Sequence, residues 1–111
     1  MIIALACEED LVAGRFAAAR SFVIYEVDFG KVGSPTVAAP ENEAPAAFLR
    51  GYAVDLVICG RIGRASQQNL LEEGIKFFGG VSGRADRALT AYLDGTLEAA
   101  ADFNDYEDEL F

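Results

Sequence analysis

A glycine-containing turn after a short apolar run has the residue types best suited to chemistry. The run is Leu56-Val57-Ile58, and the turn reads Cys59-Gly60-Arg61-Ile62-Gly63-Arg64. We expect a buried strand to end here and a helix to begin. The backbone N–H groups at a helix N-terminus point outward and carry about half a positive charge, so they suit an anion. With a thiol and two guanidinium groups beside them, the turn predicts a small anion site at the carboxyl end of a strand.

The composition bounds the class of protein. A length of 111 residues with 52% hydrophobic residues indicates one globular domain, and the net charge of −9 argues against generic binding to nucleic acid or acidic lipid. No apolar run approaches the roughly 18 residues that span a membrane, and the first residues lack the basic region of a signal peptide. Two cysteines in such a chain indicate a cytoplasmic protein with reduced thiols. The chain has no histidine, which removes the commonest general base and metal ligand.

The order of apolar segments predicts an α/β fold. The expected strands cover residues 1–6, 21–28, 32–39, 56–59 and 75–78, with a turn at Phe29-Gly30-Lys31. Three helices are expected: one that begins near Pro45, one over residues 64–73, and one that ends at Gly95. Strands alternating with helices imply a partly parallel sheet, and the hairpin gives it an antiparallel edge. The long loop from Cys7 to Arg20 is either functional and mobile or contains a short helix.

Several landmarks follow one another along the chain. They are the opening strand 1–6, Phe16 and Ala19 ahead of residues 22–27, and the segments 51–63, 69–76 and 88–97. In these landmarks the chain resembles the dinitrogenase iron–molybdenum cofactor-binding family, whose members accompany nitrogenase cofactor assembly in nitrogen fixation or stand alone in anaerobes. The resemblance covers residues 1–98 and leaves an acidic C-terminal tail at 99–111.

The resemblance implies a ribonuclease-H-like three-layer fold. Its mixed five-stranded sheet has the order 3-2-1-4-5, with one antiparallel strand and helices on both faces. It also implies a protein that binds or carries a metal–sulfur cofactor without turnover. Members of the family often have a His-Phe-Gly-His-Ala pattern in the first loop. This chain has Arg15-Phe16-Ala17-Ala18-Ala19 instead. Arginine and alanine cannot replace imidazole as ligands, so the chain is a divergent relative that has either another ligand or none.

The implied strand order makes the two cysteines candidate metal ligands. Cys7 and Cys59 would end two parallel neighbouring strands about 4.8 Å apart, close enough to share a metal or form a disulfide. Soft thiolates suit copper(I), zinc or iron–sulfur species, and two of them require further ligands to complete a tetrahedral site. The alternative is that both cysteines are small apolar core residues.

The same order gathers arginines at the carboxyl edge of the sheet, where ligands of open α/β sheets bind. Six of the nine basic residues follow strand ends: Arg15 and Arg20, Arg61 and Arg64, and Arg84 and Arg87. Guanidinium groups bind carboxylates, phosphates and anionic clusters bidentately. The predicted cofactor-binding residues are Arg15, Gly60, Arg61, Gly63 and Arg64. The alternative is that Glu8, Glu9 and Asp10 neutralise these arginines through ordinary surface ion pairs.

These observations predict a non-enzymatic carrier of an anionic metal–sulfur cofactor, similar to the iron–molybdenum cofactor, or of its precursor. Its partner would be a cofactor-assembly or acceptor protein. No nucleophile–histidine pair exists, and residues 1–6 carry none of the carboxylates that a two-metal nuclease requires. The alternative is a divergent interaction protein without a cofactor site that acts through its sheet edge or acidic tail. That tail is either a mobile, solvated terminus or a peptide that binds a partner or a second subunit in a homo-oligomer.

Overall fold

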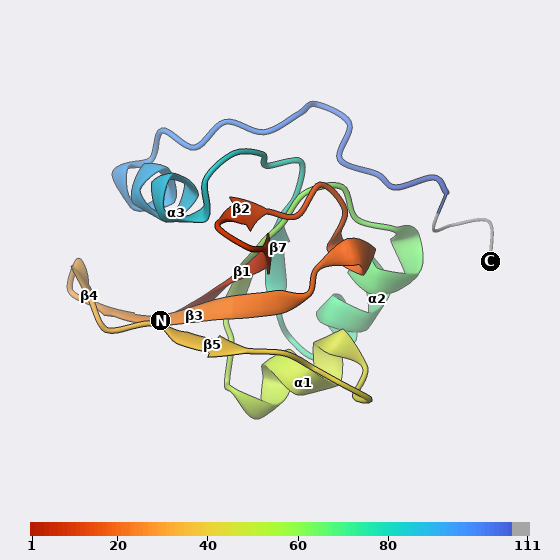
Figure 1. Cartoon of the computed structure of the whole chain (residues 1–111), viewed down its shortest axis with the longest axis horizontal. Coiled ribbons are helices and arrows are strands. Elements are labelled where there is room, and N and C mark those ends of the chain that lie inside the picture. Colours follow the sequence, from red (N-terminus) through yellow and green to blue (C-terminus); the bar gives the residue numbers. More distant parts are fainter. Residues whose placement is uncertain (108–111) are drawn as a thin grey trace.

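The structure is a computed structural model that describes residues 1–107 (Figure 1). Residues 108–111 of the predicted tail lie outside the described part. The strands are β1 (Ile2–Glu8), β2 (Leu11–Val12), β3 (Ser21–Asp28), β4 (Lys31–Val32), β5 (Thr36–Ala38), β6 (Leu56–Ile58) and β7 (Lys76–Phe78). The helices are the short 3-10 helix η1 (Phe16–Ala18) and the α-helices α1 (Pro45–Gly51), α2 (Arg64–Glu72) and α3 (Ala85–Asp94).

The strands form one open, mixed sheet. Its order is β4-β3-β1-β6-β7, with β2 paired to β1 and β5 paired to β3. Strand β1 is antiparallel to β3 and parallel to β6, and β6 is parallel to β7. The sheet has seven strands rather than the expected five. The expected strand 32–39 is interrupted around Pro35, which has no N–H to donate, and β2 forms inside the first loop.

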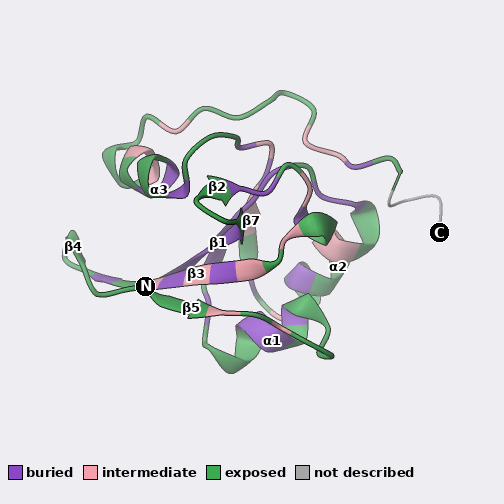
Figure 2. Ribbon diagram, in the orientation of Figure 1, coloured by how far each residue is buried: buried purple, intermediate pink, exposed green. Residues whose placement is uncertain are grey.

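The predicted arrangement of helices on both faces of the sheet is confirmed. Side chains of β1 alternate between two apolar clusters: Ala4 and Ala6 face α1 and α2, whereas Ile3 and Leu5 face α3. Figure 2 shows the buried residues following the central strands and the inner faces of these helices. Burial on both sides explains why the first strand is apolar without interruption.

Two turns have the backbone geometry that the sequence predicts. Phe29 and Gly30 have φ angles of 49° and 77° in the tight turn between β3 and β4. Gly95 ends α3 with a φ of 76°, a conformation that glycine adopts without strain. Pro45 begins α1, where its missing N–H has no helical acceptor in any case. None of the helices in residues 1–107 combines the length and apolar character needed to cross a membrane.

Candidate functional site

Gly60 brings the first loop against the turn that follows β6. A Cβ at this position would overlap the Ala13 carbonyl oxygen and lie 2.7 Å from the Gly14 carbonyl carbon. Only glycine allows the two backbones to approach so closely. The Arg61 N–H donates to the Gly14 oxygen at 3.0 Å, and the Phe16 N–H donates to the Arg61 oxygen at 2.7 Å. The two segments are therefore fixed as a unit at the carboxyl edge of β1 and β6.

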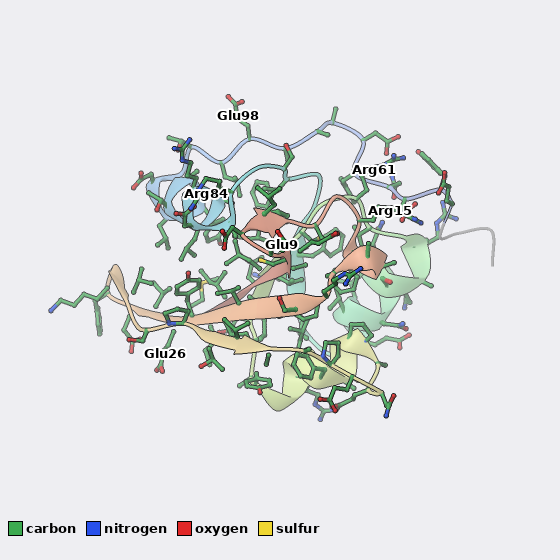
Figure 3. All side chains as sticks on the ribbon, in the orientation of Figure 1. Glu9, Arg15, Glu26, Arg61, Arg84 and Glu98 are labelled. Atoms are coloured by element: carbon green, nitrogen blue, oxygen red, sulfur yellow. The ribbon has the colours of Figure 1, made fainter. Side chains whose placement is uncertain are left out.

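This close approach places Arg15 and Arg61 side by side. The two residues form an isolated parallel β-bridge, and their side chains extend beside the same stretch of the C-terminal segment (Figure 3). The Arg15 side chain is 42% exposed, and Arg61 is exposed. Gly63 is buried and precedes Arg64, the exposed first residue of α2. Four predicted site residues (Gly60, Arg61, Gly63 and Arg64) therefore follow β6, and Arg15 joins them from the first loop.

The C-terminal segment crosses this edge of the sheet (Figure 1). The Ile62 N–H donates to the Phe103 oxygen at 2.8 Å, and the Asp105 N–H donates to the Ile62 oxygen at 3.0 Å. The Phe103 ring meets Phe77 edge-on, with 5.6 Å between centroids, and it covers Gly79. Residues 103–105 are thus an extended strand-like segment held to the turn after β6.

Asp105 places a carboxylate directly on Arg15. Arg15 Nε donates to Asp105 Oδ2 at 2.6 Å, and Arg15 Nη1 lies 3.7 Å from Glu107 Oε2. Asp105 is 3% exposed, and it is the one buried charged residue in the described part of the chain. A buried carboxylate requires hydrogen-bonded compensation, which the guanidinium supplies. This edge of the sheet therefore already accommodates an anionic group.

Further polar contacts align the segment around Asp105. Arg61 Nε donates to the Asn104 carbonyl oxygen at 3.2 Å, and Gln67 Nε2 donates to Asn104 Oδ1 at 2.9 Å. Asp102 accepts hydrogen bonds from the Asn104 backbone, the Asn104 amide and the Tyr106 hydroxyl. These bonds, with a smaller contribution from the Arg61 charge, hold the pKa of Asp102 below its ordinary value.

The structure corrects the expectation of one six-arginine patch. Arg84 lies beside α3 and away from Arg15 and Arg61 in Figure 3. Its Nε donates to Asp86 Oδ1 at 3.1 Å, which raises the pKa of Arg84 and lowers that of Asp86. The expectation was wrong because the turn after β7 packs against β2, through a bridge between Leu11 and Arg84, on the α3 side of the edge.

The structure places the two thiols, which are expected from the sequence to share a metal, in different apolar clusters. Cys7 belongs to the α3-side cluster and Cys59 to the α1/α2-side cluster, so they face opposite sides of the sheet. Both are free and fully buried. Burial raises the pKa of the Cys7 thiol to about 11 and that of Cys59 to about 12, so both remain protonated at neutral pH. The alternative interpretation, small apolar core residues, fits this geometry.

The side chains that meet at the edge of β1 and β6 determine the kind of ligand that could bind there. Within residues 1–107, no three side chains of histidine, cysteine, aspartate or glutamate come together in an arrangement that could hold a metal ion. The charged donors that the described residues bring to this edge are guanidinium groups, which bind anions through hydrogen bonds.

The sequence reasoning missed the contribution of the tail to this site. Phe103, Asn104 and Asp105 belong to the acidic tail, for which the sequence predicts no contact with the turn after β6. Two signals were present. The tail alternates acidic and aromatic residues, and Gly79-Gly80 follows β7. A Cβ on Gly80, whose φ is +79°, would lie 3.0 Å from the Ala100 oxygen, so these glycines mark the path of the tail.

Residues 1–95 match the model of the family described as dinitrogenase iron-molybdenum cofactor. The chain belongs to this family. The match covers every strand and α-helix, including the turn after β6 and the first loop. The contacts of Phe103 and Asp105 lie beyond the matched residues. A comparison with curated proteins finds no match.

Solved structures share the fold of this family member. The crystal structure of a protein named PH0822 superposes with a TM-score of 0.84 at 24% identity, covering 94% of this chain and 100% of that one. The apo form of the orange protein from Desulfovibrio gigas superposes with a TM-score of 0.76 at 24% identity, covering 94% and 96%. At these identities the similarity establishes the mixed α/β fold of a single open sheet with three α-helices.

Proposed function

We propose that this protein is a non-enzymatic carrier that binds an anionic metal–sulfur cofactor, similar to the iron–molybdenum cofactor, or its precursor. The site is the edge formed by Arg15, Gly60, Arg61, Gly63 and Arg64. The observation that supports the proposal is the buried Asp105 carboxylate on Arg15, which is a negative group held at this edge by a guanidinium. Membership of the family supports the choice of cargo.

In this proposal the cargo is held by charge and hydrogen bonds. Arg15 and Arg61 would contact its anionic surface, and their positions depend on the close backbone approach at Gly60. The two thiols have no part in the site, because they are buried, protonated and on opposite faces of the sheet. Recognition without a metal–protein bond permits reversible capture and transfer to an acceptor protein.

Anaerobic reconstitution tests this function. The full chain would be incubated with iron, molybdate and sulfide, desalted, and measured for bound metal and absorbance. We expect bound metal in the wild type, a loss of at least tenfold in Arg15→Gln and Arg61→Gln, and no change in Arg50→Gln. Arg50 is a matched control because it lies on α1 and pairs with Glu73. Equal metal content in all four proteins would contradict the proposal.

A second candidate function is an interaction protein that has no cofactor site. The observation that favours it is the donor set, since the described residues bring no three metal-ligating side chains together. This candidate predicts no bound metal in any of the four proteins. Loss of metal in a Cys7→Ser or Cys59→Ser variant that remains folded would instead restore the thiols as ligands.

A further inference from the structure

We propose that residues 103–105 are an internal ligand of the arginine site, and that binding of an anionic cargo and docking of this segment exclude each other. This inference rests on the function proposed above, because both concern the same site. It assigns the acidic tail a role in controlling access to the arginines.

The contacts of the segment have the form of ligand recognition. Phe103 packs its ring against Phe77 and over Gly79, Asn104 is held by Arg61 and Gln67, and the Asp105 carboxylate lies on Arg15. Figure 2 shows the tail as largely exposed, with buried and half-buried residues where it crosses the site. The flanking residues Asp102 and Tyr106 are exposed. Residues 103–105 are therefore the part of the tail most buried against the site, and Ala100 and Glu107 add contacts to Gly80 and Arg15 on either side.

The Asp105 carboxylate takes the hydrogen bond that an anionic cargo would need. Arg15 Nε is its donor at 2.6 Å. A second anion on the same guanidinium would stand within a few ångströms of Asp105 in a partly buried environment, where like charges repel strongly. Arg61 is engaged as well, since its Nε donates to the Asn104 carbonyl oxygen. The two guanidinium groups can offer their full set of donors to a cargo only when the segment leaves.

Release of the segment breaks a small, defined set of interactions. The main-chain bonds between Ile62 and the segment are lost, while the Ile62 oxygen keeps the hydrogen bond from Gln67 Nε2 at 2.9 Å. The sheet, its core clusters and the contact at Gly60 involve none of residues 103–105, apart from the half-buried Phe103 ring. The site can therefore open while the fold stays intact.

In this competition only the molecules in which the segment is released can bind cargo. The apparent affinity is therefore the intrinsic affinity multiplied by the fraction of such molecules. A substitution that weakens docking without touching the arginines should raise the affinity. Asp105→Asn is such a substitution, because it removes the charge and preserves the shape. A hydrogen bond to a charged group is worth enough to shift an equilibrium by about tenfold or more.

The test is an oxygen-free titration of the full chain with tetrathiomolybdate, a coloured dianion of molybdenum and sulfur, with sulfate as a second probe. The titration compares the wild type, Asp105→Asn and Glu98→Gln. Glu98→Gln is the matched control because Glu98 is an exposed acid away from Arg15 and Arg61 (Figure 3). Hydrogen exchange at the amides of residues 62 and 105 reports docking in each protein, since both amides bond across the contact.

We expect Asp105→Asn to bind tetrathiomolybdate about tenfold more tightly than the wild type, with Glu98→Gln within twofold of the wild type. We also expect saturating probe to accelerate exchange at both amides of the wild type, a result that depends on no variant. Equal effects of sulfate would identify the site as one for dianions in general, still in competition with the tail. Equal affinities in all three proteins, with no change in exchange, would overturn the inference while leaving the proposed function intact. Absence of binding in all three would overturn the proposed function and the competition with it.

Discussion

Substituting Gly60 with alanine should separate the first loop from the turn after β6. The new Cβ would overlap the Ala13 carbonyl oxygen and lie 2.7 Å from the Gly14 carbonyl carbon. These are backbone atoms, so no side-chain rotation relieves the overlap. The segments must move apart, which weakens two hydrogen bonds, from the Arg61 N–H at 3.0 Å and from the Phe16 N–H at 2.7 Å.

The expected cost of Gly60→Ala is about 3–5 kcal/mol. The two hydrogen bonds contribute about 1 kcal/mol each, and the forced displacement contributes about 1–3 kcal/mol. Small domains have about 5–15 kcal/mol of total stability, so this loss is large but leaves room for a folded variant.

Urea unfolding followed by circular dichroism measures this effect. The control is Gly14→Ala, because an added Cβ there meets nothing within 4 Å, and we expect it to stay within about 1 kcal/mol of the wild type. Gly60→Ala should also bind tetrathiomolybdate more weakly, since Arg15 would lose its place beside Arg61. A Gly60→Ala protein with wild-type unfolding free energy and denaturant slope would refute the reasoning.

Three further predictions follow from the described contacts. Arg15→Gln should lower the free energy of unfolding by about 2 kcal/mol in urea titrations, because it leaves the buried Asp105 carboxylate without its guanidinium. The loss is limited to this size because the Arg15 side chain is 42% exposed, and solvent screens its charge. Burial raises the pKa of Cys7 to about 11 and of Cys59 to about 12 from an ordinary 9.0, so the unfolded chain releases these protons first as pH rises. The unfolding free energy should therefore fall between pH 9 and 11, by at most about 1.4 kcal/mol per pH unit per thiol, and less steeply in a variant with both cysteines replaced by alanine. Phe103→Ala should accelerate hydrogen exchange at the Ile62 amide severalfold, because the ring contact anchors the tail there; unchanged exchange would contradict this role.

The fold was largely predictable because its signals are local. Uninterrupted apolar residues identify β1 as a strand buried on both faces, Gly95 and Pro45 bound helices through their backbone geometry, and the turn at residues 29–31 closes a hairpin. The division of residues 32–39 into β4 and β5 was not predicted, because Pro35, which has no N–H to donate, indicates an edge position but not where pairing with β3 stops.

The site was predictable only in part. The turn after β6 could be predicted because a glycine follows the end of a strand, and Arg15 was expected beside it. The face of the sheet on which each side chain lies could not be predicted in the same way. Cys7 is the penultimate residue of β1 and Cys59 directly follows β6, yet side chains alternate along a strand, and the two residues differ by one step of that alternation. The docking of Asp105 on Arg15 joins residues 90 positions apart and leaves no periodic pattern in the sequence.

The central claim is that Arg15 and Arg61 bind an anionic metal–sulfur cargo. Its most direct test is the metal and inorganic sulfide content of the full chain purified without oxygen, as wild type and as Arg15→Gln. The account predicts metal together with sulfide in the wild type and at least a tenfold reduction in the variant. Equal content in the two proteins, or none in the wild type, would contradict it.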